Sequence, residues 1–379
     1  MTAALPVSTH APHRVHANIY PGCVASNIST LRTGLLRQGH TPRFCATVKS
    51  DAYGHGLRNV LPGLNDACAL AVMQLSDAYD CRMAGWRKTI VVLGGLGDES
   101  EVGMLDLPAL HLVITHAAQI DWLAASPIAQ PDLFIWLRFR GDIGLTGFDD
   151  RAYREAYARC AGLAAARRIA GVGHLHHHAS AERDHGIAAA DARFKAVVSA
   201  LPGPCSTSNS ATVLRHAEHA ARDDWIRPGL ALFGASPLAH RSARELGFKP
   251  AMSLHARIIG VRDLVRGESM GYNASFTAAA PTRVGIVSCG YGDGYPRHAP
   301  PGTPVQVGTR LTRTLGTVTM DLMTIDLTGL PEANIGHRVT LWGTPELPVE
   351  TVASAIGTIA ADLFTGLTRR VPLIPINAV

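Results

Sequence analysis

Several features common in secreted, membrane-spanning and nucleic-acid-binding proteins are missing from this sequence. The seven cysteines are odd in number and widely spaced, and none belongs to a CxxC pair, so we expect reduced core thiols and no disulfide framework. No stretch of about 18 uninterrupted apolar residues occurs, and the N-terminal segment lacks the pattern of a secretory signal. The net charge of +5 is spread without a basic block, which indicates neither a nucleic acid nor an anionic membrane as partner. A soluble, cytoplasmic protein is therefore expected.

The first two thirds of the sequence alternate between short apolar runs and longer segments with helical spacing. A chain of 379 residues that is 47% hydrophobic has enough apolar material for a large core and two domains. Eight strand-like runs are present, at 43–49, 67–73, 89–95, 110–115, 132–139, 169–177, 203–208 and 229–234. Eight βα units fit a closed (β/α)8 barrel better than an open sheet. We predict such a barrel over residues 1–244.

Beyond residue 244 the pattern changes to alternating strands. The strand-like stretches, at 252–265, 282–290, 303–327 and 337–343, are separated by Gly and Pro turns. Helical spacing returns at 349–364. Residues 245–379 are therefore predicted to form a second, mainly β domain.

A lysine stands at the end of the first strand-like run, in the stretch ATVKSDAYGHG at 46–56. Catalytic groups of a (β/α)8 barrel lie at the carboxyl ends of its strands, so Lys49 occupies a position suited to chemistry. Burial of the side chain lowers the pKa of an amine and makes it nucleophilic toward carbonyl groups. Lys49 can therefore form a Schiff base with an aldehyde cofactor. The plainer alternative is a solvent-facing charge on a loop.

This stretch resembles the pyridoxal phosphate (PLP) attachment motif of the alanine racemase family, with Ser50 and Asp51 where that family usually has Ala and Asn. Further family motifs follow in the family order and extend the resemblance over nearly the whole chain. They are SNSA at 208–211, WIRPGLALFG at 225–234, GESMGYNASF at 267–276, GYGDGYPR at 290–297, GTVTMDLMTIDL at 316–327 and RRVPLI at 369–374. The resemblance implies a PLP-dependent racemase that interconverts the L and D forms of alanine or a related small amino acid.

The resemblance also assigns cofactor contacts within the predicted barrel. Lys49 matches the residue that carries PLP and acts as one base, and His177 matches the histidine beside the cofactor ring. Tyr53, Ser210 and Gly229 match phosphate contacts. Ser210 opens a helical pattern, where a hydroxyl and helix amides can meet a phosphate; an ordinary N-cap serine is the alternative.

Other matches concern the ring nitrogen and the second face of the substrate. Arg227 matches the arginine that faces the pyridine nitrogen, where a guanidinium keeps that nitrogen unprotonated; a surface ion pair is the alternative. Tyr272 matches a second base, opposite the lysine across the substrate Cα, as inversion of a stereocentre requires; a packing tyrosine is the alternative. Tyr291, Met320 and Asp321 match residues that reach the barrel of the other subunit. The resemblance thus implies a homodimer with composite sites.

Two regions depart from the family pattern. Arg138 stands where the family has a lysine that is often carbamylated, and Leu145 where it has the arginine that helps to hold the substrate carboxylate. The two replacements are consistent with each other, because a negatively charged carbamate buried without its partner arginine would destabilise the protein. We expect Arg138 or Arg140, of equal parity on one strand, to supply the missing positive charge for substrate binding. Ala361 stands where the family has a phosphate-binding tyrosine, so one phosphate hydrogen bond is missing.

The histidine-rich stretch HLHHH at 174–178 invites a metal-site interpretation. On a strand, residues 174, 176 and 178 share one face and 177 lies on the other. No Asp, Glu or Cys at a matching spacing is evident elsewhere, so we expect no metal.

Three other functions remain as alternatives to a racemase. A barrel-type PLP decarboxylase should carry a Cys-Asp pair in the loop where this chain has Thr319 and Met320. A PLP-binding relative with little catalysis is the second, and a zinc hydrolase built on the histidine stretch is the third.

Overall fold

The computed structural model describes residues 13–376, except 38 and 40. Two compact units are present: residues 21–249, the barrel unit, and residues 13–20 with 250–376, the β unit. The predicted division after residue 244 put the N-terminal segment in the barrel. The segment instead contains strand β1 (His16–Ile19), which pairs antiparallel with β10 (Met252–Leu264) of the β unit. No helix in the described part of the chain is long and apolar enough to span a bilayer.

The barrel unit is built on parallel strands, paired in the order β8-β7-β6-β5-β4-β3-β2-β9. These are β2 (Arg43–Thr47), β3 (Ala69–Val72), β4 (Thr89–Val92), β5 (Leu110–Ile114), β6 (Phe134–Arg138), β7 (Gly171–Leu175), β8 (Cys205–Ser206) and β9 (Trp225–Ile226). The first and last strands of this order meet, because the Ser206 hydroxyl donates to the Trp225 carbonyl at 2.7 Å. The predicted (β/α)8 barrel is confirmed.

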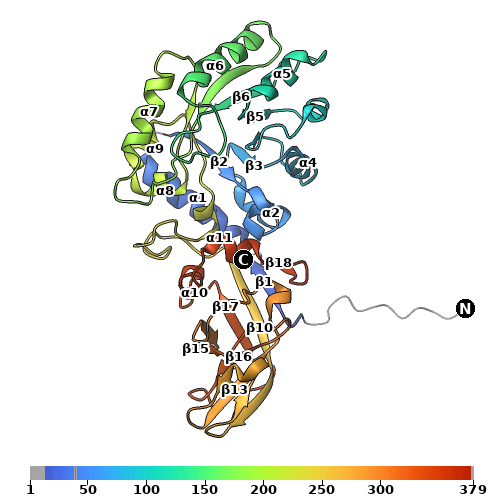
Figure 1. Cartoon of the computed structure of the whole chain (residues 1–379), viewed down its shortest axis with the longest axis vertical. Helices are drawn as coiled ribbons and strands as arrows, with labels where there is room; N and C mark the ends of the chain where they lie inside the picture. Colours follow the sequence, from blue (N-terminus) through green and yellow to red (C-terminus); the bar gives the residue numbers. More distant parts are fainter. Residues whose placement is uncertain (1–12, 38, 40, 377–379) are drawn as a thin grey trace, which may run out of the picture. The chain divides into compact units, whose positions relative to one another are not determined.

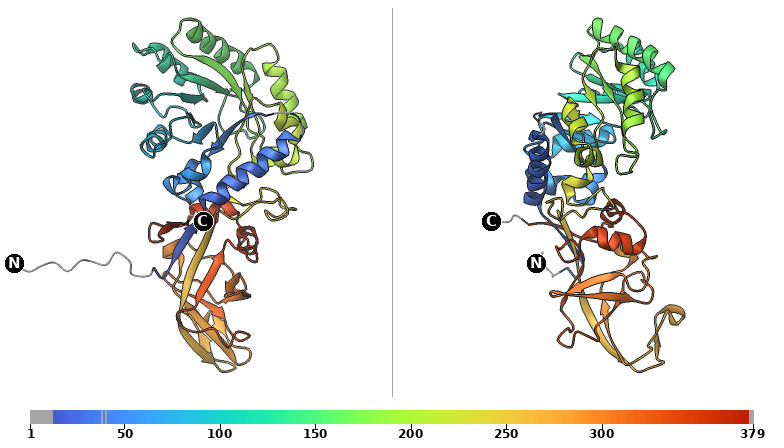
Figure 2. Two further views of the ribbon diagram at one scale, coloured as in Figure 1. Left: turned by 180° about the vertical axis from the view of Figure 1, so that it is seen from behind. Right: turned by 90° about the vertical axis from the view of Figure 1, so that its left-hand side faces the viewer.

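Helices cover the outside of the strands, as Figures 1 and 2 show. They are α1 (Pro21–Leu36), α3 (Leu57–Val60), α4 (Leu75–Met83), α5 (Ala117–Ala125), α6 (Asp150–Ala165), α7 (Ala188–Val198), α8 (Ser210–Arg215) and α9 (Ala217–Arg222). Several begin at side-chain caps: Asp149 accepts from the Ala152 amide at 2.9 Å, and Asn209 from the Thr212 amide at 3.0 Å. Such caps satisfy amides that the first helical turn leaves unpaired.

The eighth predicted strand was wrong in position. Residues 229–234 contain the 3-10 helix η3 (Leu230–Phe233), and the eighth strand is β9 just before it. Gly234 ends the helix with a φ of 76°, a left-handed conformation that glycine adopts without strain. A short buried apolar run has no polar face to distinguish a strand from a helix.

The β unit is mainly one antiparallel sheet, paired in the order β13-β16-β15-β14-β17-β10-β1-β18. Besides β1 and β10 it contains β13 (Thr282–Val287), β14 (Pro304–Val307), β15 (Arg310–Leu315), β16 (Met323–Asp326), β17 (Arg338–Trp342) and β18 (Leu373–Pro375). A small hairpin, β11 (Ser269–Met270) with β12 (Phe276–Thr277), adds to it. The predicted helix at 349–364 is divided into α10 (Val349–Ile356) and α11 (Ala360–Thr365), because Gly357 turns the chain with a φ of 84°.

Candidate active site

Lys49 lies where the chain leaves β2 in an unusual left-handed turn. The four residues after it, Ser50 to Tyr53, have φ values of 54°, 49°, 57° and 53°, and none is glycine. A left-handed helical conformation costs an L-residue roughly 1–2 kcal/mol, so the surrounding contacts must hold this turn in place. Asp51 contributes one such contact, because its carboxylate accepts from the Leu57 amide at 2.7 Å. Unusual backbone of this kind is concentrated at functional sites.

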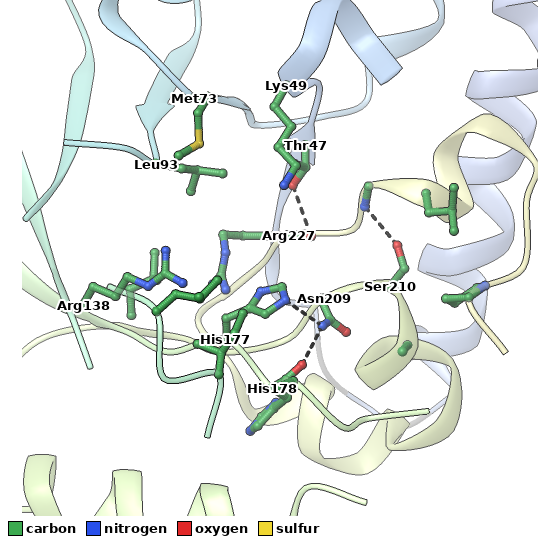
Figure 3. A pocket seen from close by; sticks show the side chains of 18 of the residues that line it. Thr47, Lys49, Met73, Leu93, Arg138, His177, His178, Asn209, Ser210 and Arg227 are labelled. Carbon is green, nitrogen blue, oxygen red and sulfur yellow. Dashed lines mark hydrogen bonds between the residues drawn. The ribbon is translucent and has the colours of Figure 1, made fainter. Parts of the chain in front are cut away.

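A cavity of about 530 Å³ opens at this end of the barrel strands. Seven of the predicted site residues line it: Lys49, Tyr53, Arg138, His177, Ser210, Arg227 and Gly229. Figure 3 shows several of them converging from β2, β6 and the segments after β7, β8 and β9. Thr47, Leu145 and Asn209 are further lining residues. The barrel thus brings these seven predicted site residues together at one cavity.

The cavity has a positive electrostatic character. Lys49, Arg138 and Arg227 line it, whereas Glu182 is the one acidic residue among its described lining residues. Burial lowers the pKa of Lys49, and the charge of Arg138 lowers it further. A larger fraction of neutral, nucleophilic amine is therefore present at neutral pH than for a free lysine.

Arg227 is buried and fixed by two hydrogen bonds from its guanidinium. It donates to the Ser206 hydroxyl and, at 2.7 Å, to the main-chain carbonyl of His176. Burial lowers its pKa to about 10, so it remains a cation at pH 7. The alternative prediction that Arg227 forms a surface ion pair is therefore wrong, because the barrel encloses the side chain.

A small cradle forms where Ser210, Gly229 and Tyr53 meet. The Ser210 hydroxyl oxygen accepts from the Gly229 amide at 2.9 Å. A Cβ at position 229 would lie 2.5 Å from the Tyr53 hydroxyl, so glycine is required for this approach. Burial raises the pKa of Tyr53 to about 12, which keeps its hydroxyl protonated. The cradle can therefore offer hydroxyl donors to an anion.

His177 is held beside this cradle by a residue that the sequence interpretation missed. The Asn209 side-chain amide lies 3.3 Å from His177 Nε2 and also donates to the His178 carbonyl at 3.0 Å. Burial, followed by the charge of Arg227, lowers the pKa of His177 to about 3, so the imidazole is neutral. Asn209 was detectable as an N-cap in SNSA, but its second role depends on the tertiary structure.

Arg138 and Arg140 are separated by the structure. Arg138 lines the cavity, and its Nε has no hydrogen-bond partner among the described residues. Arg140 is absent from the described lining and lies 3.5 Å from Asp149 in an exposed ion pair. Between these two candidates for the missing positive charge, the geometry favours Arg138. Leu145, at the family arginine position, lines the cavity with 76% of its surface exposed.

The remaining predicted site residues, Tyr272, Tyr291, Met320 and Asp321, lie in the β unit. The Tyr291 amide donates to the Thr319 carbonyl at 3.0 Å. Because Thr319 directly precedes Met320 and Asp321 in the sequence, Tyr291 lies close to both residues. Asp321 accepts from Arg370 at 2.7 Å. Tyr272 begins the 3-10 helix η4 (Tyr272–Ala274) between β11 and β12, and 78% of its surface is exposed, so it does not pack within its own chain.

Comparisons with known proteins support the class indicated by the barrel and its lysine pocket. The family description "Alanine racemase, N-terminal domain" matches residues 19–237, and "Alanine racemase, C-terminal domain" matches residues 251–375. An alanine racemase of Bordetella petrii is 40% identical over 372 residues, covering 96% of this chain and 99% of its own length. One from a Janthinobacterium species is 41% identical over 358 residues, covering 93% and 98%.

Solved structures give the same result. The biosynthetic alanine racemase of Pseudomonas aeruginosa superposes with a TM-score of 0.88 at 38% identity, covering 95% of this chain and 98% of that one. Alanine racemase from Acinetobacter baumannii gives a TM-score of 0.86 at 29% identity, covering 95% and 99%. The fold and the lysine-centred cavity define an isomerase of the barrel-type racemase class. The chain belongs to the alanine racemase family.

Proposed function

We propose that this protein is a PLP-dependent racemase that interconverts the L and D forms of alanine or a related small amino acid. The observation that carries the proposal is the position of Lys49, a half-buried amine of lowered pKa in a cavity that also holds an anion cradle and two arginines. PLP contains an aldehyde, a phosphate dianion and an aromatic ring. Its chemical groups fit the amine, the cradle and the neutral imidazole of His177.

The barrel residues would hold the cofactor as follows. Lys49 would bind the aldehyde carbon covalently, and the Tyr53 and Ser210 hydroxyls would donate to the phosphate beside Gly229. Arg227 would face the ring nitrogen, and as a buried cation it would keep that nitrogen from being protonated. When bound, PLP would supply electron withdrawal that acidifies the substrate Cα.

Racemisation needs a proton acceptor and a proton donor on opposite faces of the substrate Cα. Lys49 Nζ would exchange the proton on one face, and Tyr272 Oη on the other. Tyr272 is exposed on the β unit, as is Met320 at 53%. Exposed large apolar side chains of this kind suit a subunit interface. We infer a cytoplasmic homodimer in which Tyr272, Tyr291, Met320 and Asp321 of one subunit complete the barrel pocket of the other.

Arg138 would bind the substrate carboxylate. Its guanidinium lines the cavity with Nε unpartnered among the described residues, and burial lowers its pKa, which indicates incomplete charge compensation in the absence of an anion. A carboxylate would supply both the missing acceptor and the missing negative charge. The positive charge lost at Leu145 would then come from Arg138, the last residue of β6.

The test is a deuterium-exchange panel with L- and D-amino acids in D2O, read by chiral chromatography and mass spectrometry. We expect alanine or a small analogue to be interconverted with uptake of Cα deuterium and without release of carbon dioxide. Carbon dioxide release would instead indicate the decarboxylase. Exchange of no amino acid by folded, cofactor-loaded protein would contradict the proposal.

Arg138→Leu, with Arg140→Leu as its matched control, tests the carboxylate contact. A hydrogen bond to a charged group contributes about 1.5–3 kcal/mol, so kcat/KM should fall roughly 10- to 150-fold in the first variant. The control should keep wild-type kinetics because Arg140 forms only an exposed ion pair. Equal kinetics in both variants would remove Arg138 from the site.

A further inference from the structure

Three metal-ligand side chains from three different segments of the barrel unit lie close together, and one of them, His178, also lines the cavity that holds Lys49. His178 follows β7, Asp191 lies in α7 and His219 lies in α9. One potential ligand atom from each lies within 4.8 Å of the other two, and His219 Nδ1 lies 3.6 Å from Asp191 Oδ1. His178 is 1% exposed, and its ring points away from Lys49 and Arg227 (Figure 3).

Hydrogen bonds fix which nitrogen of His178 carries a proton. The Thr212 hydroxyl donates its only proton to Asn209 Oδ1 at 3.2 Å. With its proton engaged there, the hydroxyl oxygen accepts at its other contact, which is His178 Nδ1 at 3.3 Å. His178 Nδ1 is thus the protonated nitrogen, and Nε2 carries a lone pair.

The same reasoning applies to His219. The Thr207 hydroxyl donates to the Asp223 carboxylate at 3.0 Å, so it accepts from His219 Nε2 at 2.8 Å. The lone pair of His219 is then on Nδ1, the atom that faces Asp191 Oδ1. Ligand histidines in metal sites are held in this way, with the other ring nitrogen donating to a fixed acceptor.

With these tautomers, the atoms that face one another, His178 Nε2, His219 Nδ1 and Asp191 Oδ1, are all hydrogen-bond acceptors. His178 Nε2 and Asp191 Oδ1 have no hydrogen-bond partner among the described residues, and Lys195 pairs with the other oxygen of Asp191, Oδ2, at 2.7 Å. A buried acceptor without a donor costs roughly 1–3 kcal/mol. Two lone pairs and a carboxylate oxygen at one point need a cation or a donor between them.

Solvent can reach this point. Asp191 and His219 line a concavity of about 470 Å³, and their side chains are 15% and 16% exposed. His178 closes the inner side. An ion could therefore enter from the concavity and be held on three sides, with its fourth position open to water.

We propose that His178, Asp191 and His219 form a Zn²⁺ site. Two imidazole nitrogens and one carboxylate oxygen are a ligand set that suits Zn²⁺, and a carboxylate oxygen with a hydrogen-bonded partner is typical of such sites. The distance between Asp191 Oδ1 and His219 Nδ1 requires only a small adjustment, because two ligands about 2.0–2.1 Å from a tetrahedral ion lie near 3.4 Å apart. The bound ion would link β7, α7 and α9, next to His177 of the cofactor pocket.

The test uses the full-length, cofactor-loaded protein after chelator treatment, with Zn²⁺ itself as the probe. We measure bound zinc by mass spectrometry, affinity by chelator competition, and the Tm with and without zinc. The wild-type chain should bind one equivalent and melt at a higher temperature with zinc. His219→Gln and Asp191→Asn should each weaken binding at least about 100-fold, since even an outer partner of a metal ligand is worth about 10- to 100-fold.

Glu218→Gln is the matched control, because Glu218 lines the same concavity on the same helix without belonging to the cluster. It should retain the wild-type zinc affinity and Tm shift. His219→Gln alters a partly exposed residue, so its folding can be checked by circular dichroism independently of zinc. Failure of folded wild-type protein to bind an equivalent of zinc would overturn the proposal. So would unchanged affinity in the two ligand variants, or loss of zinc in Glu218→Gln.

Discussion

In the barrel unit the candidate functional residues lie in a cavity and are held by hydrogen bonds, whereas those of the β unit lie on exposed loops. Arg227 is buried and donates twice, and Ser210 and Gly229 are joined directly. Tyr272, by contrast, is 78% exposed. Under the proposed function the barrel residues would hold the cofactor, and Tyr272 would act only where the β unit meets another surface.

Replacing Lys49 should have the largest effect. Lys49→Ala removes both the proposed covalent anchor and one base, so racemisation should fall at least about 10³-fold, and the visible absorption of the lysine-bound cofactor should disappear. Lys249→Ala, an exposed lysine of the same unit, is the control and should keep both. Full activity in Lys49→Ala would rule out the barrel pocket as the catalytic centre.

A side chain at position 229 should weaken cofactor binding. In Gly229→Ala the new Cβ would lie 2.5 Å from the Tyr53 hydroxyl, so a phosphate donor must move. Loss of one charged hydrogen bond, about 1.5–3 kcal/mol, predicts a Kd for PLP roughly 10- to 150-fold higher, measured by fluorescence titration of the apoprotein.

Gly34→Ala is the matched substitution, because nothing lies within 4 Å of a Cβ there and the residue is inside helix α1. It should leave the Kd unchanged and stabilise the helix by up to about 1 kcal/mol. A Gly229→Ala protein with wild-type affinity would show that the cradle does not hold the phosphate.

The smallest predicted effect is a shift in pH dependence. The Arg138 charge lowers the pKa of Lys49, because it disfavours the protonated amine. Arg138→Leu should therefore raise that pKa and move the pH profile for PLP capture by the apoprotein to higher pH, followed by stopped-flow absorbance. Arg140→Leu should leave the profile in place. A shift to lower pH in Arg138→Leu would contradict the electrostatic role.

Sequence patterns predicted the barrel and the β domain because both depend on local apolar periodicity. They misplaced the strand after β8, because β9 has only two residues and the apolar run at 229–234 is buried as a helix. They also missed β1, whose four residues are stabilised by pairing with β10 far along the chain. Long-range pairing of so short a segment leaves no periodic signal.

The site residues were predicted from sequence motifs, but motifs could not predict the backbone conformation around them or the direction in which each side chain points. The left-handed turn at Ser50 to Tyr53 contains no glycine, so the sequence gives no indication of its positive φ angles. Arg138 and Arg140 have the same parity in the sequence, but β6 ends at Arg138, and only the structure separates the cavity-lining side chain from the exposed one. The sequence predicted no acidic partner for the histidine stretch, whereas the structure places an Asp191 carboxylate oxygen within 4.8 Å of ligand nitrogens of His178 and His219, a proximity between distant segments that no sequence spacing reveals.

Tyr272→Phe tests the division between the units most directly. The substitution removes one hydroxyl from an exposed side chain, so the fold and cofactor absorption should be unchanged. In D2O, racemisation of alanine should fall about 10²- to 10⁴-fold, the usual contribution of a general acid–base group, while one enantiomer should still exchange its Cα proton through Lys49 without inversion. Tyr79→Phe, on α4 of the barrel unit, should behave as wild type. Undiminished racemisation in Tyr272→Phe would contradict a two-base site completed by the β unit.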